Sequence, residues 1–239
     1  FLQPQERERM YIGGRAYGIG SCWVSIHMYY NKKLFDQAKV AYPPADPDKA
    51  WTWSEFVTAA RKLTLDKNGR NALDPKFDRN NIVQYGVDIP TWWLPLIACI
   101  WTNGGKFLNE TRTKFELDDA RTVRILQEIA DLKSKYYASP QASVYEQLGM
   151  GAWQMLATGK VAMTIDGSWA LQDLSKMGFP LGTAVLPRRD RLSRPVTAIQ
   201  AHMHVIYKGT KYPEASWRLL RFFSTEYYQL NMCKVGVWL

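Results

Sequence analysis

Apolar residues recur along this chain with two different spacings, and the two alternate from one segment to the next. Helical spacing, with apolar positions three and four residues apart, covers 31–40, 52–63, 92–101, 118–133, 144–160 and 213–224. Shorter alternating or β-branched runs cover 15–20, 23–31, 82–89, 161–165, 182–187 and 201–207. Strands that alternate with helices are typical of an α/β fold, so we predict a mainly parallel or mixed sheet with flanking helices.

Helix ends and buried faces can be assigned for three of these segments. The segment TWSEFVTAARKL at 52–63 opens with a capping box formed by Thr52 and Glu55. The segment 118–133 has acids in its first turn and lysine near its end, which complements the helix dipole. The inward-facing residues that the spacing predicts in the three amphipathic helices are Phe56, Ala59, Ala60, Leu63, Val123, Leu126, Ile129, Ala130, Trp217, Leu220 and Phe223.

The polar stretch 65–81 separates a predicted helix from a predicted strand. Its Asp66, Asn68 and Asp74 resemble the odd positions of a calcium loop, but the glycine is misplaced and Phe77 stands where a bidentate glutamate belongs. A plain solvated loop is the prediction here, with a structural calcium site in 66–78 as the alternative.

Charge, cysteine content and hydropathy narrow the class of protein. The net charge is +9, but the basic residues are spread along the chain without an aromatic-interleaved stripe, so we expect no nucleic-acid partner. Cys22, Cys99 and Cys233 are odd in number and far apart, which favours buried thiols over a disulfide framework and leaves the redox compartment open. No apolar run is long enough to span a membrane and no signal peptide is visible in 1–14, so we expect a soluble chain.

Most catalytic signatures are missing from the sequence. There is no G-x-S-x-G, no H-E-x-x-H and no phosphate loop. Cys22 with His27 lacks a third group for a thiol nucleophile, and His202 with His204 lacks a third metal ligand. Asp166 is the best candidate acid of a hydrolase, but it has no evident partner carboxylate. We therefore predict a protein that is not an enzyme and has neither a cofactor nor a metal site.

Aromatic residues are the unusual part of the composition. The chain has ten tryptophans and thirteen tyrosines, more than its core needs. Half-exposed aromatic faces suit flat apolar ligands, above all the C–H faces of sugar rings. The tryptophans that stand near turn-forming residues, outside helical periodicity, are Trp23, Trp92, Trp93, Trp101 and Trp169.

The segment MTIDGSWALQDL at 163–174 places one of these tryptophans on a strand-to-helix turn. The letters MTI predict the end of a core strand, and ALQDL predicts the start of a helix. Gly167 between them is predicted to permit a tight turn. Trp169 then lies at the carboxyl end of a strand, the edge at which ligands bind in open α/β sheets. We predict that it faces a ligand.

Several of these stretches, in this order, resemble the extracellular solute-binding proteins of carbohydrate ABC importers, the maltose-binding-protein superfamily. The resemblance runs from Gly14 to Ser224 and rests on YGIG…MYYNKKLFDQA, TWSEFVTAARKLT, QYGVDI, ATGKVAMTIDGSWA, GTAVLP and YPEASWRLLRFFS. It implies a type II periplasmic-binding-protein fold, in which two lobes joined by hinge crossovers close on a sugar like a Venus flytrap.

The resemblance also implies a set of ligand-binding residues. Trp169 of the G-S-W turn corresponds to a ring-stacking aromatic, and Trp92 and Trp93 fall near another aromatic of the cleft. The resemblance implies that Ser21, Trp23 and Ser25 bind ligand from the hinge crossover before YYNK. It implies the same role for Gln200 and His202 in the return crossover AIQAHM. The full set that we expect to bind ligand is Trp169, Trp23, Ser21, Ser25, Trp92, Trp93, Gln200, His202 and Asp166.

Two departures from the family pattern affect the expected domains. Gly20 stands where the family usually has proline, so the first hinge is expected to differ in shape. Family chains also begin about a hundred residues earlier and continue past the end of this one. The resemblance thus implies that 1–24 is a remnant of the first lobe with a hinge crossover, 25–196 the second α/β lobe, and 197–239 the return crossover with a first-lobe segment.

The function that the resemblance implies is the substrate-binding component of a bacterial ABC sugar importer. Its expected partners are a mono- or oligosaccharide and the membrane permease subunits, and it is expected to act as a monomer in the periplasm or as a lipoprotein on the outer face of the cell membrane. The alternatives are a carbohydrate-active hydrolase, which would require two facing carboxylates, and a basic surface-interaction protein, whose binding to polyanions would depend on salt. The positive charge also raises the possibility of an anionic sugar.

Overall fold

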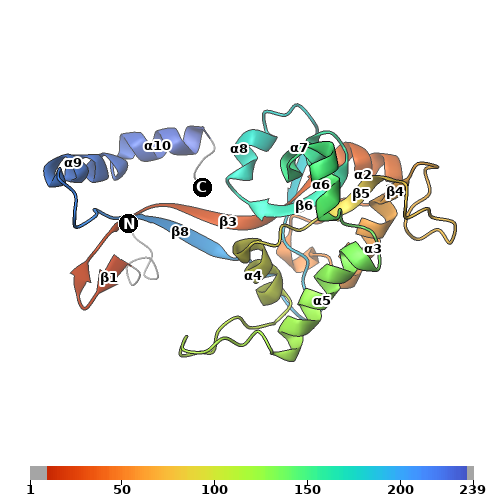
Figure 1. The fold of residues 1–239 in the computed structure, drawn as a ribbon, viewed down its shortest axis with the longest axis horizontal. Coiled ribbons are helices and arrows are strands. Elements are labelled where there is room, and N and C mark those ends of the chain that lie inside the picture. Colours follow the sequence, from red (N-terminus) through yellow and green to blue (C-terminus); the bar gives the residue numbers. More distant parts are fainter. Residues whose placement is uncertain (1–9, 236–239) are drawn as a thin grey trace. The chain divides into compact units, whose positions relative to one another are not determined.

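The computed structural model describes residues 10–235, whose helices and strands are traced in Figure 1. The chain divides into two compact units, with Ile26–Ala198 in the larger and Phe1–Ser25 together with Ile199–Leu239 in the smaller. The boundaries predicted from the sequence were 24/25 and 196/197. The assignment of these units to the second and first lobes of a binding protein stays a prediction.

The larger unit is built on a mixed sheet, as predicted. Its strand order is β4-β5-β6-β3-β7, where β5 and β6 are parallel and the other neighbours are antiparallel. The strand predicted at 23–31 is confirmed as part of one longer strand, of which the part from Ile26 onward belongs to this sheet. The strand predicted at 15–20 is instead divided between β2 (Arg15–Ala16) and the first residues of β3. The strands are β3 (Ile19–Asn31), β4 (Leu65–Asp66), β5 (Ile82–Asp88), β6 (Val161–Gly167) and β7 (Leu181–Ala184).

Helices cover both faces of this sheet, because alternate residues of its central strands point to opposite sides. Ile26 and Met28 of β3 belong to the main core cluster with side chains of α3, α4 and α5, whereas Tyr29 packs with Leu156 and Leu174 of α7 and α8. Every residue of β6 is buried. The helices of this unit are α2 (Lys32–Ala38), α3 (Trp53–Leu63), α4 (Trp93–Thr102), α5 (Ala120–Ser134), α6 (Ala142–Leu148), α7 (Ala152–Ala157) and α8 (Ala170–Leu174), with a short 3-10 helix at Pro47–Lys49.

The start of α3 confirms the predicted capping box. The Thr52 N–H donates to Glu55 Oε2 at 2.8 Å, and the Glu55 N–H donates to Thr52 Oγ1 at 3.3 Å. The face predicted for α5 is wrong in part, since Val123 is 51% exposed and the buried residues include Thr122 and Ile125. The hydroxyl of Thr122 accepts the Lys106 N–H at 2.8 Å and donates to the Lys106 carbonyl at 2.8 Å, which lets a polar residue occupy the inner stripe.

The helix predicted at 144–160 is wrong, because two separate helices occupy these residues. α6 ends at Gly149, whose φ of 61° is left-handed, and α7 begins after Gly151. A left-handed residue cannot continue a right-handed helix, and glycine adopts that conformation without steric cost. The break turns Trp153 into a residue of the first turn of α7.

The polar loop after β4 is held together by a carboxylate. Asp66 is 1% exposed and accepts the N–H groups of Asn68, Arg70 and Asp78 at 2.8, 2.9 and 2.9 Å. Its oxygens therefore stabilise the loop through backbone donors.

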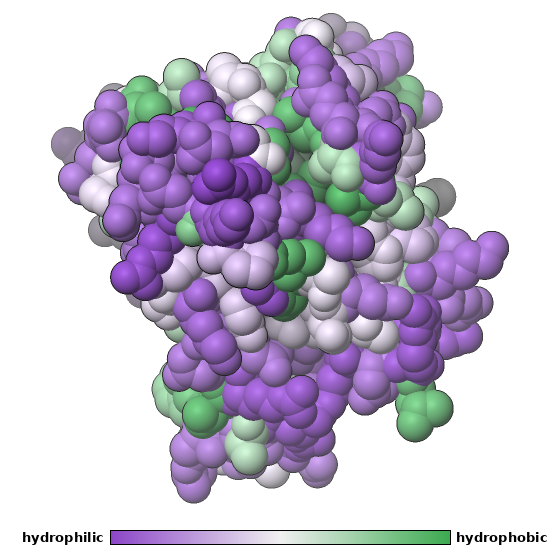
Figure 2. All heavy atoms as spheres, turned by 90° about the vertical axis from the view of Figure 1, so that its right-hand side faces the viewer, coloured by the Kyte–Doolittle hydropathy of each residue, from purple (hydrophilic) through white to green (hydrophobic). Residues whose placement is uncertain are grey.

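Across residues 10–235, no group of three or more His, Cys, Asp or Glu side chains is arranged to hold a metal ion. Figure 2 looks onto the end of the molecule that carries this loop, and its surface is mostly hydrophilic.

The smaller unit contains the first half of β3 paired antiparallel with β8 (Ile199–His204), the hairpin β1 (Tyr11–Ile12) and β2 (Arg15–Ala16), and helices α9 (Pro213–Phe223) and α10 (Glu226–Lys234). The β3–β8 register shifts between Gly20 and Cys22. In α9 Leu220 is buried as predicted, but Trp217 is 46% exposed, so its predicted inward position is wrong. Among the residues of α9, Leu220 alone is buried by the described part of the chain. No helix within 10–235 has the length and apolarity to cross a bilayer.

Candidate functional site

Trp169, the tryptophan that the sequence predicts to face a ligand, lies just after the carboxyl end of β6. Trp169 stands at the N-cap of α8, and its half-buried ring packs against both core clusters of the larger unit. The ring lies directly on Gly167: a Cβ at this glycine would come within 2.1 to 2.2 Å of three Trp169 ring atoms. Gly167 does not have the left-handed φ of a turn glycine. It directly precedes the turn at 168–169, as predicted, and glycine is needed here because its missing side chain leaves room for the indole.

Two of the other predicted tryptophans lie at the start of α4, and one of them, Trp92, contacts Trp169. The rings of Trp92 and Trp169 are 5.6 Å apart between centroids with an interplanar angle of 46°, and Trp92 contacts Trp93 edge-on at 5.9 Å. Trp92 is 40% exposed and Trp93 is 52% exposed. The structure thus assembles three tryptophans, from segments about seventy-five residues apart, into one cluster with accessible ring faces.

Asp166 lies beneath this cluster and is fully engaged by protein donors. It is 6% exposed, and its two oxygens accept the Trp153 Nε1–H at 2.6 Å and the Gly167 N–H at 2.7 Å. Burial raises the pKa of Asp166, although hydrogen bonds from Trp153, from the Gly167 N–H and from Trp169 act in the opposite direction. The carboxylate therefore orients the indoles around it.

A pocket of about 630 Å³ opens beside these residues. Trp92, Trp153 and Asp166 line it, so it joins apolar ring faces to a buried acceptor. Trp169 and Trp93 are not among its lining residues, although both contact Trp92, which is. The remaining lining residues are Pro90, Gly151, Ala152, Gln154, Asp173, Lys176 and Met177. A concave site with aromatic walls and a few polar groups is suited to a small polar ligand that has an apolar face.

Two residues of this region were missed by the sequence reasoning. Trp153 was assigned to a continuous helix, although the G-M-G stretch before it signals a new helix start. Asp88 ends β5, which is parallel to β6, so Asp88 and Asp166 reach the same edge of the sheet. Burial raises the pKa of Asp88, which is 3% exposed and does not line the pocket. Asp88 is thus closed off from solvent and does not offer the partner carboxylate that a hydrolase would need next to Asp166.

The candidates from the crossovers lie in the smaller unit and do not share a face. In the β3–β8 pairing Trp23 is opposite Ala201, Ser25 opposite Ile199, Val24 opposite Gln200 and Cys22 opposite His202. Directly opposed side chains point to the same side of a sheet and neighbours along a strand alternate. Trp23 and Ser25 therefore point to one side, and Gln200 and His202 to the other. The side chain of Ser21 lies outside the described residues.

The cysteines occupy structural positions. Cys22 and Cys99 are buried, Cys233 is exposed, and none of the three forms a disulfide. Burial raises the pKa of Cys99 to about 12. Cys22 and His27 stand five residues apart on β3 and thus point to opposite sides of the strand. These positions do not assemble a thiol nucleophile with its base.

Comparison with known proteins gives one sequence family and many similar folds. The family described as bacterial extracellular solute-binding protein matches residues 8–238. No curated protein is similar enough in sequence to match the chain. Similar structures include the ABC substrate-binding protein Lmo0181 from Listeria monocytogenes in complex with cycloalternan, with a TM-score of 0.82, 22% identity, and coverage of 100% of this chain and 56% of that one.

Two further structures are similar to nearly all of this chain. The solute-binding protein from Thermotoga lettingae bound with alpha-D-tagatose has a TM-score of 0.77 and 22% identity over 98% of this chain and 56% of that one. Maltose-bound MalE3 from T. maritima has a TM-score of 0.75 and 19% identity over 98% of this chain and 57% of that one.

These likenesses confirm the predicted fold, the mixed sheet of the type II periplasmic-binding proteins. The chain spans a little over half the length of the structures it matches. The family match, in contrast, covers nearly all of the 239 residues of this chain. The chain therefore belongs to the family of bacterial extracellular solute-binding proteins.

Proposed function

We propose that this chain supplies sugar-binding surface to the substrate-binding component of a carbohydrate ABC importer. The observation that supports it best is the contact of Trp92 with Trp169 beside the 630 Å³ pocket of the larger unit. Indole faces bind the C–H faces of a sugar ring, while Asp173, Gln154 and Lys176 offer hydrogen bonds to its hydroxyl groups. Each stacked ring contributes ~1 to 3 kcal/mol, by analogy with bases stacked on aromatic side chains.

The composition of the pocket favours a neutral sugar over an anionic one. Asp166 and Asp173 line it together with one cation, Lys176. An anionic sugar would have to approach two carboxylates, and like charges at short range disfavour binding. The ligand class that we propose is therefore a neutral mono- or oligosaccharide.

The predicted ligand-binding residues of the smaller unit lead to a separate proposal. Because Trp23 with Ser25 and Gln200 with His202 face opposite sides of the β3–β8 ribbon, we propose that only one of these pairs binds the sugar. Trp23 and Ser25 combine an aromatic ring with a polar side chain, as the lining of the pocket in the larger unit does. Separate double substitutions of the two pairs decide between them: only one is expected to weaken sugar binding.

The partners follow from the same proposal. The family is extracellular by its description, which places the protein outside the cytoplasm. We propose the permease subunits of an ABC importer as its membrane partners, a monomeric state, and closure of two lobes on the sugar. The family and the similar structures are solute-binding proteins, and we propose that this chain does not hydrolyse its ligand. Release of reducing sugar from a glycan panel would contradict that part.

A sugar titration tests the proposal directly. The purified chain is titrated with maltotriose, D-tagatose and D-mannitol while tryptophan fluorescence is recorded, and any hit is measured by calorimetry. At least one sugar is expected to give a saturable signal that Trp92→Ala weakens at least tenfold. Trp101→Ala is the matched control, because Trp101 is 42% exposed on the same helix α4 but does not line the pocket. No saturable change with any of the sugars would refute the proposal.

A further inference from the structure

A second pocket of the larger unit lies between helices α3 and α5, away from the tryptophan cluster. Its volume is about 400 Å³. Arg61, Arg124 and Arg189 line it together with Glu128, the aromatic ring of Tyr136 and the buried Trp53. Three guanidinium groups thus face one carboxylate. None of the residues predicted from the sequence to bind ligand lies in this pocket, which we call the arginine pocket.

The backbone fixes the position of this pocket's lining. The segment after β7 runs alongside the start of α3, where the Trp53 N–H donates to the Arg188 carbonyl at 2.7 Å and the Arg188 N–H donates to the Trp51 carbonyl at 2.8 Å. This short pairing places Arg189 next to Trp53. The Arg189 Nη1–H also donates to the Asn103 carbonyl at 3.4 Å. Backbone pairing and this hydrogen bond therefore fix the position of Arg189 at the pocket.

Trp53 provides an observation independent of charge. Its side chain is 5% exposed, yet its indole Nε1–H has no hydrogen-bond partner in the described part of the chain. The Nε–H of Arg61 is likewise buried without a partner. Leaving a buried donor unsatisfied is costly, and such groups are rare in native structures. Both donors belong to residues that line the arginine pocket, although the two nitrogen atoms have almost no exposed surface, so an acceptor in the pocket would reach them only after a small shift of these side chains.

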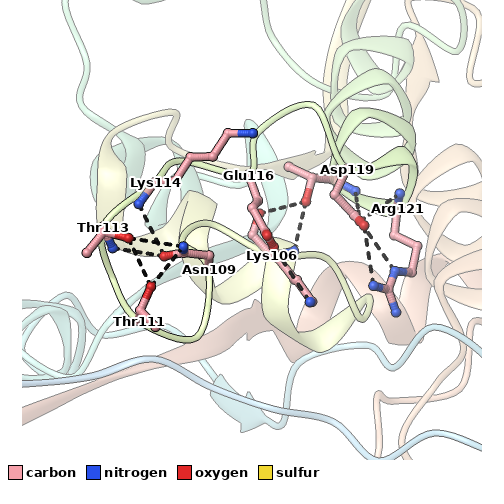
Figure 3. Close-up of polar contacts among 9 residues, drawn as sticks. Lys106, Asn109, Thr111, Thr113, Lys114, Glu116, Asp119 and Arg121 are labelled. Carbon is pink, nitrogen blue, oxygen red and sulfur yellow. Dashed lines mark hydrogen bonds and ion pairs between the residues drawn. The ribbon is translucent and has the colours of Figure 1, made fainter.

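The charges around the pocket are not balanced by the chain. Arg124 pairs with Glu128 at 3.0 Å, and Arg189 approaches Asp190 at 3.8 Å. Arg61 has no carboxylate partner among the described residues. Its Nη2–H donates to the Ala72 carbonyl at 3.1 Å, and its guanidinium carbon lies 5.1 Å from the centre of the Tyr136 ring. Farther along α5, Arg121 is engaged by Asp119, as Figure 3 shows, so it does not add to the excess. The unpaired cation is therefore on the side of the pocket nearest Tyr136.

We propose that the arginine pocket binds the oxyanion group of a small organic molecule, either a phosphate monoester or a carboxylate. Guanidinium groups bind both oxyanions through paired N–H donors. The acceptor oxygens would bind the guanidinium groups and, after a small side-chain shift, Trp53 Nε1–H and Arg61 Nε–H, while the ring of Tyr136 and the side chain of Val57 receive the organic part. The site is separate from the proposed sugar pocket, since the two share no lining residue.

A calorimetric titration with aromatic anions tests the proposal. The probes are phenyl phosphate and benzoate, with inorganic phosphate and phenol as the separated halves. At least one of the two aromatic anions is expected to bind saturably and to raise the Tm, and the tighter of the two identifies the oxyanion. Phenol is expected not to bind. Binding of inorganic phosphate without either aromatic anion would overturn the proposed ligand class.

Three variants locate the site and one serves as control. Trp53→Phe removes the indole N–H but keeps a ring, and Arg61→Gln and Arg189→Gln remove one guanidinium each; every variant is expected to weaken binding about tenfold. Arg70→Gln makes the same chemical change at an exposed residue outside the pocket and is expected to bind like wild type. Arg189→Gln keeps the test decisive where either of the other two fails to fold. Unchanged affinity in the folded variants, or phenol binding as tightly as the anions, would overturn the proposal, whatever the outcome of the sugar titrations.

Discussion

Replacing Gly167 with alanine tests how the end of β6 positions the tryptophan cluster. The added Cβ would lie 2.1 Å from the Trp169 ring, whereas ordinary contact begins at 3.4 Å, so the ring must withdraw by about 1.3 Å, the difference between the two. It cannot do so freely, because it packs against both core clusters and contacts Trp92. Overpacking of this kind costs about 1 to 3 kcal/mol of unfolding free energy. We expect Gly167→Ala to lose that amount of stability.

The same displacement is expected to weaken sugar binding. Moving Trp169 disturbs Trp92, and loss of one stacked ring amounts to ~1 to 3 kcal/mol, which is about 5-fold to 150-fold in affinity. The assays are urea unfolding followed by circular dichroism and titration with the sugar that binds wild type. Gly151→Ala is the matched control for the unfolding assay, because its added Cβ would meet only Gln154 Oε1 at 3.8 Å; it is not used in the sugar titration, since Gly151 lines the pocket.

A double-mutant cycle separates the steric clash from other effects of the methyl group. In a Trp169→Ala background the ring is gone, so Gly167→Ala is expected to be neutral, or to stabilise by about 0.4 to 1 kcal/mol through the lower entropy of the unfolded chain. Wild-type stability and affinity in Gly167→Ala, or an equal penalty in both backgrounds, would refute the packing of Trp169 on Gly167.

Three further outcomes are expected. Trp169→Ala should weaken sugar binding at least tenfold and also lower the urea midpoint, because its ring belongs to both core clusters; an unchanged sugar affinity would contradict the stacking role. Because burial raises the native pKa of Asp166, the native state holds that proton more tightly than the unfolded state, and stability should fall as pH rises from 3.8 through the raised pKa. Asp166→Asn should remove this part of the decrease, so a wild-type-minus-variant difference in unfolding free energy that is flat between pH 3 and 7 (roughly one proton's full titration range) would contradict the assignment. Asp66→Asn should destabilise by about 1 to 3 kcal/mol because it removes acceptors of backbone N–H groups; a calcium-dependent rise in wild-type stability would instead support a bound ion in this loop.

Local signals were sufficient where neighbouring residues decide the structure. The capping box at Thr52 and Glu55 forms with the predicted hydrogen bonds, because its donors and acceptors lie within one helical turn. The apolar residues before Asn31 predicted the central strand, although their alternation indicated one buried face, whereas both faces are buried between two layers of helices. The ordered motifs also identified the family. In each of these cases the partner of a residue is close in sequence or fixed by periodicity.

Local signals failed where the partner comes from elsewhere in the chain. Trp217 and Val123 have helical spacing but are exposed, because which stripe is buried depends on what packs against the helix. The residues around Gly167 predict a turn glycine. Only the position of the Trp169 ring shows that a glycine is needed because any side chain here would collide with that ring. The crossover candidates divide between two faces because strand pairing, not motif membership, sets their direction.

The sequence by itself determined the α/β class, the main helices, the family and the tryptophans of the candidate site, because hydrophobic period, capping chemistry and motif order are written along the chain. Only the tertiary structure decided which residues meet. It joined Trp92 to Trp169, placed Trp153 on Asp166, and gathered Arg61, Arg124 and Arg189 around an unsatisfied Trp53 indole. Such contacts link positions many residues apart and depend on register, helix rotation and packing, which no local window of sequence encodes.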